Sequence, residues 1–364
     1  MSKNTDLIAQ FEQALCDTYA LSHSTLNDED NMFALGVDSM FLMRMVSQFR
    51  RLGCKVSLKQ LYQQTTLGDM RALLGSYSTT NNALEPKAPI SFKPLCQRGN
   101  RVDELWVLCP FAGGSHSAFS SWNSLPQQEL PMNSLILLAT YPGRDQRMKE
   151  HALASISEIA CDLFDTLMKW IASTPQNRSL RLRICGHSMG AQVAFEVCNH
   201  FEEHYGKSTP VSQLVLSGCH APHLKSRRTL SHLNDDDFVE QLVEIGSGSP
   251  VLKEHPELLE LFLPMLRADF AATEAYLTLQ GSGAKLSHIP CTLLFGEQDP
   301  EAWSSEVVAW QEWHTRPEMT SISSLPGDHF YITDQPSLFI QSVINHTLDA
   351  SRASRNPFGE HHYG

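Results

Sequence analysis

A serine in a reactive setting stands near the middle of the chain. Ser188 lies in Gly186-His187-Ser188-Met189-Gly190, which has the form G-x-S-x-G. An apolar run at 180–185 precedes it and a helical pattern follows, so we expect a sharp turn between a strand and a helix. Such a turn lifts a hydroxyl above the edge of a sheet, and the helix N-terminus directs backbone N–H groups at developing negative charge. This context predicts that Ser188 is a nucleophile.

A serine hydroxyl needs a general base, and the base needs an acid to orient it. In α/β-hydrolases these residues follow in the order Ser, acid, His. His329 follows the last expected strand and is the predicted base, and Asp299, directly after the strand before it, is the predicted acid. Asp328 is the rival acid, but it adjoins the histidine and the chain would have to fold back. Glu297 is a weaker alternative.

The donors for an oxyanion are predicted from the loop after the first expected strand and from the turn at Ser188. The loop reads Pro110-Phe111-Ala112-Gly113-Gly114-Ser115, and paired glycines let a backbone approach a substrate closely. We assign the N–H groups of Ala112, with Phe111 as the alternative, and of Met189. His187 adjoins the nucleophile on a sharp turn, points elsewhere, and is assigned to packing.

A second serine, Ser39, lies in Leu35-Gly36-Val37-Asp38-Ser39, where Asp38 or Ser39 can cap the N-terminus of a helix. Apolar stripes at helical spacing predict four helices that must bury against each other in a bundle of about 75 residues. They are expected at about 5–21, from Ser39 to about 52, at 58–62 and at 67–74.

The rest of the chain predicts an α/β fold with a mainly parallel sheet. Residues 78–94 have no apolar period and several prolines, which is typical of a flexible linker. Helices are expected at Ile156–Ile171, Gln192–Tyr205 and Gln335–Leu348. A long insertion at about 223–285 with helical patterns at Phe238–Ile245 and Leu258–Phe270 predicts a lid, and residues 351–364 a frayed tail. The expected strands are Leu105–Cys109, Leu135–Ala139, Leu180–Cys185, Leu214–Leu216, Thr292–Phe295 and Ser321–Leu325.

Composition bounds the function. With 364 residues the chain is expected to form two domains, and its formal charge of −12 argues against binding to nucleic acid. No run of about 20 apolar residues predicts a membrane span, and no secretory signal is visible, so we expect a cytoplasmic protein. The nine cysteines are scattered without a C-x-x-C pair, and we expect them to be reduced. No metal site is predicted, and His361-His362 is expected to be solvated.

Residues 95–350 resemble the type II thioesterases of nonribosomal peptide and polyketide synthesis. After the fourth expected strand, where fused terminal thioesterases often place the acid, Val215–Gly218 holds no carboxylate, which favours Asp299. Minor departures are Asp328, where glycine often precedes the histidine, and Phe111, where tyrosine is common. The motifs that carry the resemblance are Cys109–Gly114, Tyr141–Arg147, Gly186–Gly190, Ser217–Pro222 and Leu263–Phe270 with Tyr276.

Residues 1–77 are similar to peptidyl or aryl carrier domains, through Leu35–Ser39. The resemblance implies a covalent 4'-phosphopantetheine on Ser39, attached by a phosphopantetheinyl transferase. It also implies partners that supply acyl groups: an acyl- or aminoacyl-activating adenylation enzyme, or carrier domains of a synthetase. Type II thioesterases are generally free-standing, so a fused carrier is unusual.

Together the two resemblances imply hydrolysis of acyl or aminoacyl thioesters, from this chain's own arm or from other carriers, through an acyl group on Ser188. Two alternatives stay open: release by transfer to an amine or hydroxyl, and a mainly acyl-holding role with a weakly active docking domain. Arg144 and Arg147 are expected either to position the arm or a partner carrier, or to be plain surface arginines.

Overall fold

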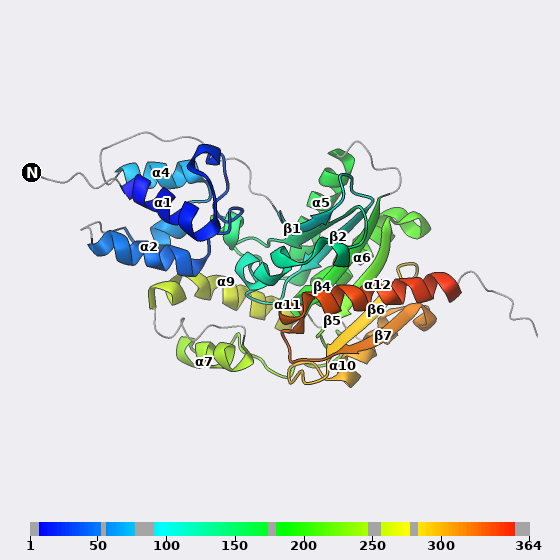
Figure 1. The fold of residues 1–364 in the computed structure, drawn as a ribbon. Helices are drawn as coiled ribbons and strands as arrows, with labels where there is room; N and C mark the ends of the chain where they lie inside the picture. The colour runs from blue at the N-terminus through cyan, green and yellow to red at the C-terminus, as the bar shows by residue number, and fades with distance from the viewer. Residues whose placement is uncertain are drawn as a thin grey trace, which may run out of the picture.

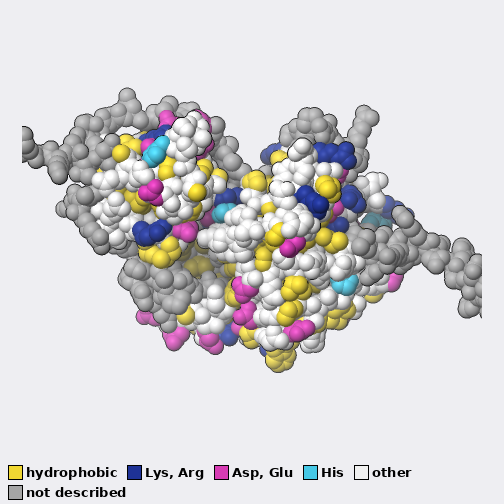
Figure 2. Space-filling model, in the orientation of Figure 1, with side chains coloured by type: hydrophobic (Ala, Val, Ile, Leu, Met, Phe, Trp, Pro, Cys, Tyr) yellow, Lys and Arg dark blue, Asp and Glu magenta, His cyan; other side chains and the backbone are white. Residues whose placement is uncertain are grey.

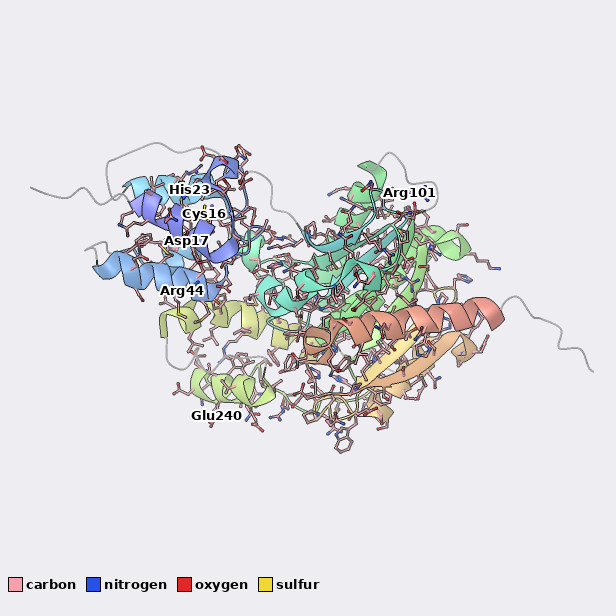
Figure 3. The ribbon with its side chains drawn as sticks, in the orientation of Figure 1. Cys16, Asp17, His23, Arg44, Arg101 and Glu240 are labelled. Atoms are coloured by element: carbon pink, nitrogen blue, oxygen red, sulfur yellow. The ribbon has the colours of Figure 1, made fainter. Side chains whose placement is uncertain are left out.

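The computed structural model describes residues 7–51, 56–76, 91–173, 180–246, 256–276 and 283–353. A helical unit and a larger unit built on a sheet lie side by side (Figure 1). The space-filling view shows a notch between the two units on one face (Figure 2). Side chains labelled in Figure 3 mark the two units, with Cys16 and Asp17 on α1, Arg44 on α2 and Arg101 on the sheet unit.

The helical unit holds the four predicted helices: α1 (Leu7–Tyr19), α2 (Ser39–Arg51), α3 (Leu58–Tyr62) and α4 (Leu67–Ser76), with a 3-10 turn η1 at His23–Thr25. Its core joins apolar side chains from all four helices, among them Phe11, Phe49, Leu61 and Leu74. The bundle therefore forms because each stripe covers the others, as the spacing predicted.

The sheet has seven strands in the order β1-β3-β2-β4-β5-β6-β7. Strand β1 pairs antiparallel with β3, and every other neighbouring pair is parallel. The strands are β1 (Phe92–Arg98), β2 (Glu104–Cys109), β3 (Ser134–Ala139), β4 (Arg181–His187), β5 (Val211–Ser217), β6 (Cys291–Gly296) and β7 (Thr320–Leu325).

Strand β1 corrects one predicted boundary. The linker was expected to end at residue 94, but β1 begins at Phe92, and residues 77–90 lie outside the described chain. Pro94 made this strand hard to predict, because proline has no N–H to donate to a neighbouring strand. It is tolerated here because β1 is an edge strand.

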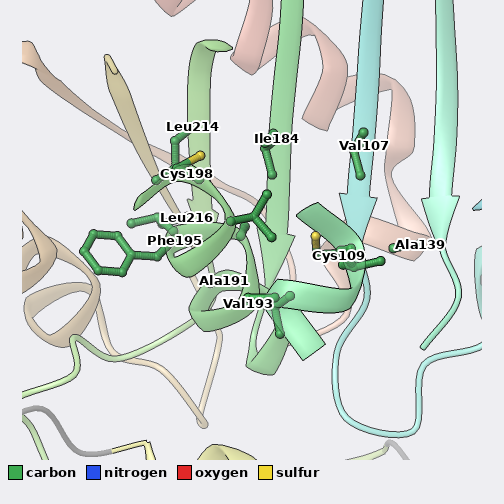
Figure 4. Close-up of a cluster of buried hydrophobic side chains, with 14 of the residues drawn as sticks. Val107, Cys109, Ala139, Ile184, Ala191, Val193, Phe195, Cys198, Leu214 and Leu216 are labelled. Carbon is green, nitrogen blue, oxygen red and sulfur yellow. The ribbon is translucent and has the colours of Figure 1, made fainter. Parts of the chain in front are cut away.

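Helices cover both faces of the sheet. Helices α5 (Ile156–Ser173) and α6 (Met189–Tyr205) pack on one face, where strand residues such as Ile184 belong to one buried cluster with Ala191 and Val193 of α6 (Figure 4). Helix α12 (Pro336–Ala353) covers the other face together with η2 (His116–Ser124). Because α12 runs to Ala353, the predicted tail begins later than residue 351, and residues 354–364 lie outside the described chain.

The insertion between β5 and β6 contains the two predicted lid helices, α7 (Asp235–Ile245) and α9 (Pro256–Ala275), and α9 carries Pro264 inside it. Shorter elements connect the rest: η3 (Gln127–Glu129), η4 (Asp145–Arg147), η5 (Gly206–Ser208), α10 (Ser304–Val308), η6 (Ala309–Trp313), η7 (Pro317–Met319) and α11 (Tyr331–Asp334).

No helix within the described ranges is long and apolar enough to cross a membrane. Across those same ranges, no cluster of three or more His, Cys, Asp or Glu side chains is arranged to hold a metal ion. Eight cysteines are described, and each is a free thiol.

Candidate active site

Ser188 occupies the sharp turn that its sequence context predicts. It joins β4 to α6 with φ 53° and ψ −124°, a strained conformation for a residue with a side chain. Gly186 and Gly190 make the turn feasible, because a Cβ on Gly186 would lie 2.0 Å from the Gly190 carbonyl oxygen and a Cβ on Gly190 would lie 2.0 Å from the Cys109 carbonyl oxygen. The close packing around these two glycines thus keeps Ser188 in its strained conformation, at the carboxyl end of the parallel strands.

His329 and Asp299 form a buried pair beside this turn. His329 Nδ1 lies 3.0 Å from Asp299 Oδ1 and 2.9 Å from Oδ2, and both residues are 6% exposed. Asp299 Oδ1 also accepts the backbone N–H of Glu301 at 2.8 Å. Burial raises the pKa of Asp299, but the hydrogen bond and charge of His329 outweigh it and hold that pKa below its usual range. Asp299 is thus an ionised carboxylate that can orient the imidazole.

The rival acids have other partners. Asp328 accepts the backbone N–H of Phe330 at 2.9 Å, and Glu297 accepts the Ser324 hydroxyl at 3.0 Å. Of the three carboxylates considered, Asp299 is the one paired with the His329 ring.

Ser188 and His329 line the same cleft. In the described chain they share no direct hydrogen bond, so the two side chains face a common space without being locked together. Catalytic hydrogen bonds are often long in the absence of substrate and tighten when it binds.

The loop after β2 supplies candidate oxyanion donors. Phe111, Ala112 and Met189 all line the cleft. The Gly113 N–H is already donated to Asp269 Oδ2 at 2.7 Å, and the Gly114 N–H to the Phe111 carbonyl at 2.8 Å. These contacts fix the conformation of the loop. They do not decide whether the N–H of Ala112 or that of Phe111 is the oxyanion donor, which the sequence also left open.

The two predicted arginines are not surface residues. Arg144 is 2% exposed and pairs with Asp269 of α9 at 2.6 Å, while its other terminal nitrogen donates to the Gly114 carbonyl. Arg147 is 5% exposed and is held by Glu150 and Asp162. Of the two alternatives, that of plain surface arginines is therefore wrong. Protein carboxylates neutralise both charges, and Arg144 links α9 to the loop after β2.

His187 has a role that the sequence did not suggest. Its Nε2 lies 2.6 Å from the backbone carbonyl oxygen of His329, and its Nδ1 lies 2.9 Å from Ser217 Oγ. A carbonyl oxygen only accepts, so Nε2 carries the proton, and burial together with the nearby His329 lowers the pKa of His187 to about 3. The neutral ring therefore anchors the backbone of His329. The one sequence feature that could have indicated this role is the position of His187 directly before Ser188.

The second reactive setting lies in the helical unit. Ser39 is half-buried at the first residue of α2, and Asp38 Oδ1 accepts the Phe41 N–H at 2.7 Å as the predicted cap. The hydroxyl of Tyr62 lies within interaction distance of Ser39. An accessible hydroxyl at a helix N-terminus fits the attachment of a phosphate-linked group, because free N–H groups there favour negative charge.

Family comparisons agree with both settings. A thioesterase domain model matches residues 106–348, and a phosphopantetheine attachment site model matches residues 9–74. The chain belongs to the thioesterase family. It also carries a phosphopantetheine-binding domain, and it hydrolyses carrier-bound thioesters.

Individual relatives of this thioesterase cover mainly the sheet unit. The probable anguibactin biosynthesis thioesterase AngT of Vibrio anguillarum is 38% identical over 65% of this chain and 89% of its own length. The solved type II thioesterase YbtT of the yersiniabactin pathway is 39% identical with a TM-score of 0.62, over 72% of this chain and 99% of that one. Phenyloxazoline synthase MbtB of Mycobacterium tuberculosis is 26% identical over 91% of this chain and 24% of its own length.

Proposed function

We propose that Ser188, His329 and Asp299 are the catalytic triad of this thioesterase, which acts on acyl or aminoacyl thioesters in nonribosomal peptide-type biosynthesis. The observation that supports this most directly is the buried His329–Asp299 pair in the cleft that Ser188 lines. Two similar proteins support the biosynthetic setting: YbtT, a type II thioesterase of the yersiniabactin NRPS/PKS pathway, and AngT, a probable thioesterase of anguibactin biosynthesis.

The acylation step uses His329 as general base. Its Nε2 takes the Ser188 proton as the serine oxygen attacks the thioester carbonyl, and the Asp299 carboxylate stabilises the imidazolium that forms. The N–H groups of Met189 and of Ala112, or Phe111, bind the oxyanion. When the carbon–sulfur bond breaks, His329 returns the proton to the departing thiolate, which leaves as a thiol, and the acyl group remains on Ser188.

Deacylation repeats the same steps with water. His329 removes a proton from the water that attacks the acyl-Ser188 carbonyl, and then gives this proton to the Ser188 oxygen as the ester bond breaks. The product is a free acid. An amine or hydroxyl in place of water would instead yield an amide, ester or lactone.

Ser39 is the proposed attachment residue for 4'-phosphopantetheine, which supplies the thiol that carries the acyl group. This assignment implies a phosphopantetheinyl transferase as a partner. It also implies an adenylation enzyme or synthetase carrier domains as the sources of the acyl group.

Trapping the acyl group tests the proposed function. A short acyl thioester of pantetheine is mixed with the full chain, quenched in acid within the first turnover, and analysed by peptide mass spectrometry. We expect the acyl mass on the Ser188 peptide, its loss in Ser188→Ala, and its retention in Ser157→Ala, a matched change on the exposed face of α5. Acylation of another residue, or turnover that persists in Ser188→Ala, would overturn the triad.

A further inference from the structure

The helical unit rests on two segments of the thioesterase unit. Met148 from the loop after β3, and Leu261 and Phe262 from α9, pack against the core of the helical unit. The rings of Tyr62 and Phe262 meet edge to face, 5.1 Å apart. Two ion pairs flank this apolar contact, Lys149 with Asp69 at 3.6 Å and Lys59 with Glu260 at 3.8 Å.

This contact lies next to the attachment serine. Tyr62, which is 5% exposed, contacts Phe262 with its ring, and its hydroxyl lies within interaction distance of Ser39. Asp145, in the loop that also holds Met148, acts electrostatically on the same tyrosine hydroxyl. Ser39 therefore stands at the border between the units rather than on the far side of the carrier.

The same two segments hold the oxyanion loop at their other ends. In the loop after β3, Arg144 donates to the Gly114 carbonyl, and Asp145 accepts the His116 N–H at 2.9 Å. Asp145 does so with a strained φ of 46°. In α9, Asp269 accepts the Gly113 N–H. The carrier thus contacts the segments that position the donors for the oxyanion.

Helix α9 links the carrier contact to the cleft over a short length. Phe262 of α9 contacts the carrier, and Phe270 of the same helix lines the cleft. Between these two residues α9 rises about 12 Å, at about 1.5 Å per residue. A phosphopantetheine arm has about 14 bonds between the serine oxygen and the sulfur, and it reaches about 16 Å if it is extended like a peptide backbone.

We infer that Met148, Lys149 and Glu260–Phe262 form a docking surface on which the chain's own carrier presents its thioester to Ser188 in cis. This inference rests on the proposed function. The occupant is the fused carrier because its α3 already covers this surface, with an apolar centre and matched charges at the rim.

Dilution tests cis delivery. The full chain is loaded with an acyl-phosphopantetheine arm, and deacylation is followed by intact mass over a 100-fold range of protein concentration. We expect a first-order rate constant that does not change with dilution. A rate constant that falls in proportion to concentration would show delivery between chains and overturn the inference.

Mixing two variants provides an independent test. A loaded Ser188→Ala chain and an unloaded Ser39→Ala chain together contain every group, but on different molecules. We expect the mixture to deacylate at least tenfold more slowly than the loaded natural chain at equal concentration. Equal rates would contradict cis delivery, whereas a natural chain that cannot acylate Ser188 from a soluble thioester would refute the proposed function instead.

Surface variants test the location. Met148→Glu places a charge in the apolar centre, so we expect the ratio of carrier-bound to soluble thioester turnover to fall about tenfold. Lys149→Glu should lower this ratio by only about two- to fivefold, because exposed ion pairs contribute little. Adding Asp69→Lys to this variant should restore the ratio, because it forms the ion pair again with the charges exchanged. Met132→Glu is the matched control and should not change the ratio. Met132 is exposed and precedes the first residue of β3, whereas Met148 lies in the loop after β3.

The unloaded chain gives a readout that does not depend on turnover. In hydrogen exchange, the backbone amides of α3 and of α9 near Phe262 should exchange faster in Met148→Glu than in Met132→Glu. Equal exchange in the two variants would show that the docked arrangement is not populated, and the inference would fail.

Discussion

Two serines stand at the N-termini of two helices of this molecule, and their surroundings differ in nearly every respect. Ser188 has a positive φ, lies between glycines that permit no Cβ, and starts a helix without a side-chain cap. Ser39, a described residue, does not have a positive φ. It is half-buried and follows Asp38, whose carboxylate caps α2. A nucleophile needs a fixed geometry beside its base, whereas an attachment residue needs access for another enzyme. The backbone around each serine matches the chemistry proposed for it.

Exchanging each serine for alanine should separate these two chemistries, and this is the largest expected effect. Ser188→Ala should lower kcat on a soluble thioester by about a millionfold, because the residues of a triad act as a unit. Ser39→Ala should abolish the mass gain after treatment with a phosphopantetheinyl transferase and coenzyme A, yet leave turnover of the soluble thioester unchanged. Rate assays and intact mass on both variants check this contrast. A mass gain that survives Ser39→Ala would contradict it.

Asp299→Asn should come next, with a loss of about ten-thousandfold in kcat, because an amide stabilises the wrong tautomer of His329 and cannot balance the imidazolium charge. Asp328→Asn is the matched control, since Asp328 bonds to a backbone N–H and not to the ring. Steady-state kinetics on a soluble thioester measure both variants. Equal losses would show that the acid has been assigned to the wrong residue.

His187→Phe should lower kcat by about 10- to 100-fold with little change in KM, because His329 loses the contact that fixes its backbone. His187→Gln retains an N–H donor and should recover part of the loss. A purely structural role for His187 would lower stability in both variants without this difference between them in kcat. Kinetics and thermal unfolding of the two variants separate these outcomes.

The same histidine should make stability depend on pH. Its folded pKa of about 3 lies below the value of about 6.5 expected when unfolded, so its contribution is complete above pH 6.5 and is lost as the pH falls. Between pH 7 and pH 5 this loss is about 2 kcal/mol in the free energy of unfolding of the sheet unit. Urea unfolding at both pH values should show a smaller pH dependence in His187→Phe than in the natural chain. An unchanged dependence would rule out a neutral buried ring.

The smallest expected effect concerns the start of α2. Asp38→Ala removes the carboxylate that accepts the Phe41 N–H and should cost about 1 kcal/mol of stability in the helical unit. No corresponding cap exists to remove at Ser188. Chemical unfolding followed in the helical unit measures the change, and Asp17→Ala, at an exposed position of α1, is the control.

Local patterns predicted most of this fold and indicated the residues of the candidate site. The four carrier helices and the order Ser188, Asp299, His329 could be read because each depends on a short motif or a regular spacing. The strand at Leu180 was less clear, since Arg181 and Arg183 interrupt its apolar run. In the structure Arg183 is buried against Glu104 and Gln213, partners that a linear reading cannot supply.

What the sequence did not predict depends on contacts between distant segments. The sequence left open whether Arg144 positions the arm or is a plain surface residue, because its partner, Asp269, lies 125 positions away. The role of His187 needed the backbone of His329, which is 142 positions away. The contact between Tyr62 and Phe262 joins two units that each fold around a separate core. The apolar spacing within either unit therefore could not predict it.

Pro264 gives the lid helix a further property. A proline inside a helix has no N–H to donate, so the carbonyl four residues earlier, here that of Glu260, lacks its usual intrahelical partner. This break falls between the turn that bears the carrier and the turn that holds Gly113. The backbone hydrogen bonding of α9 is therefore interrupted between the end that contacts the carrier and the end that holds Gly113.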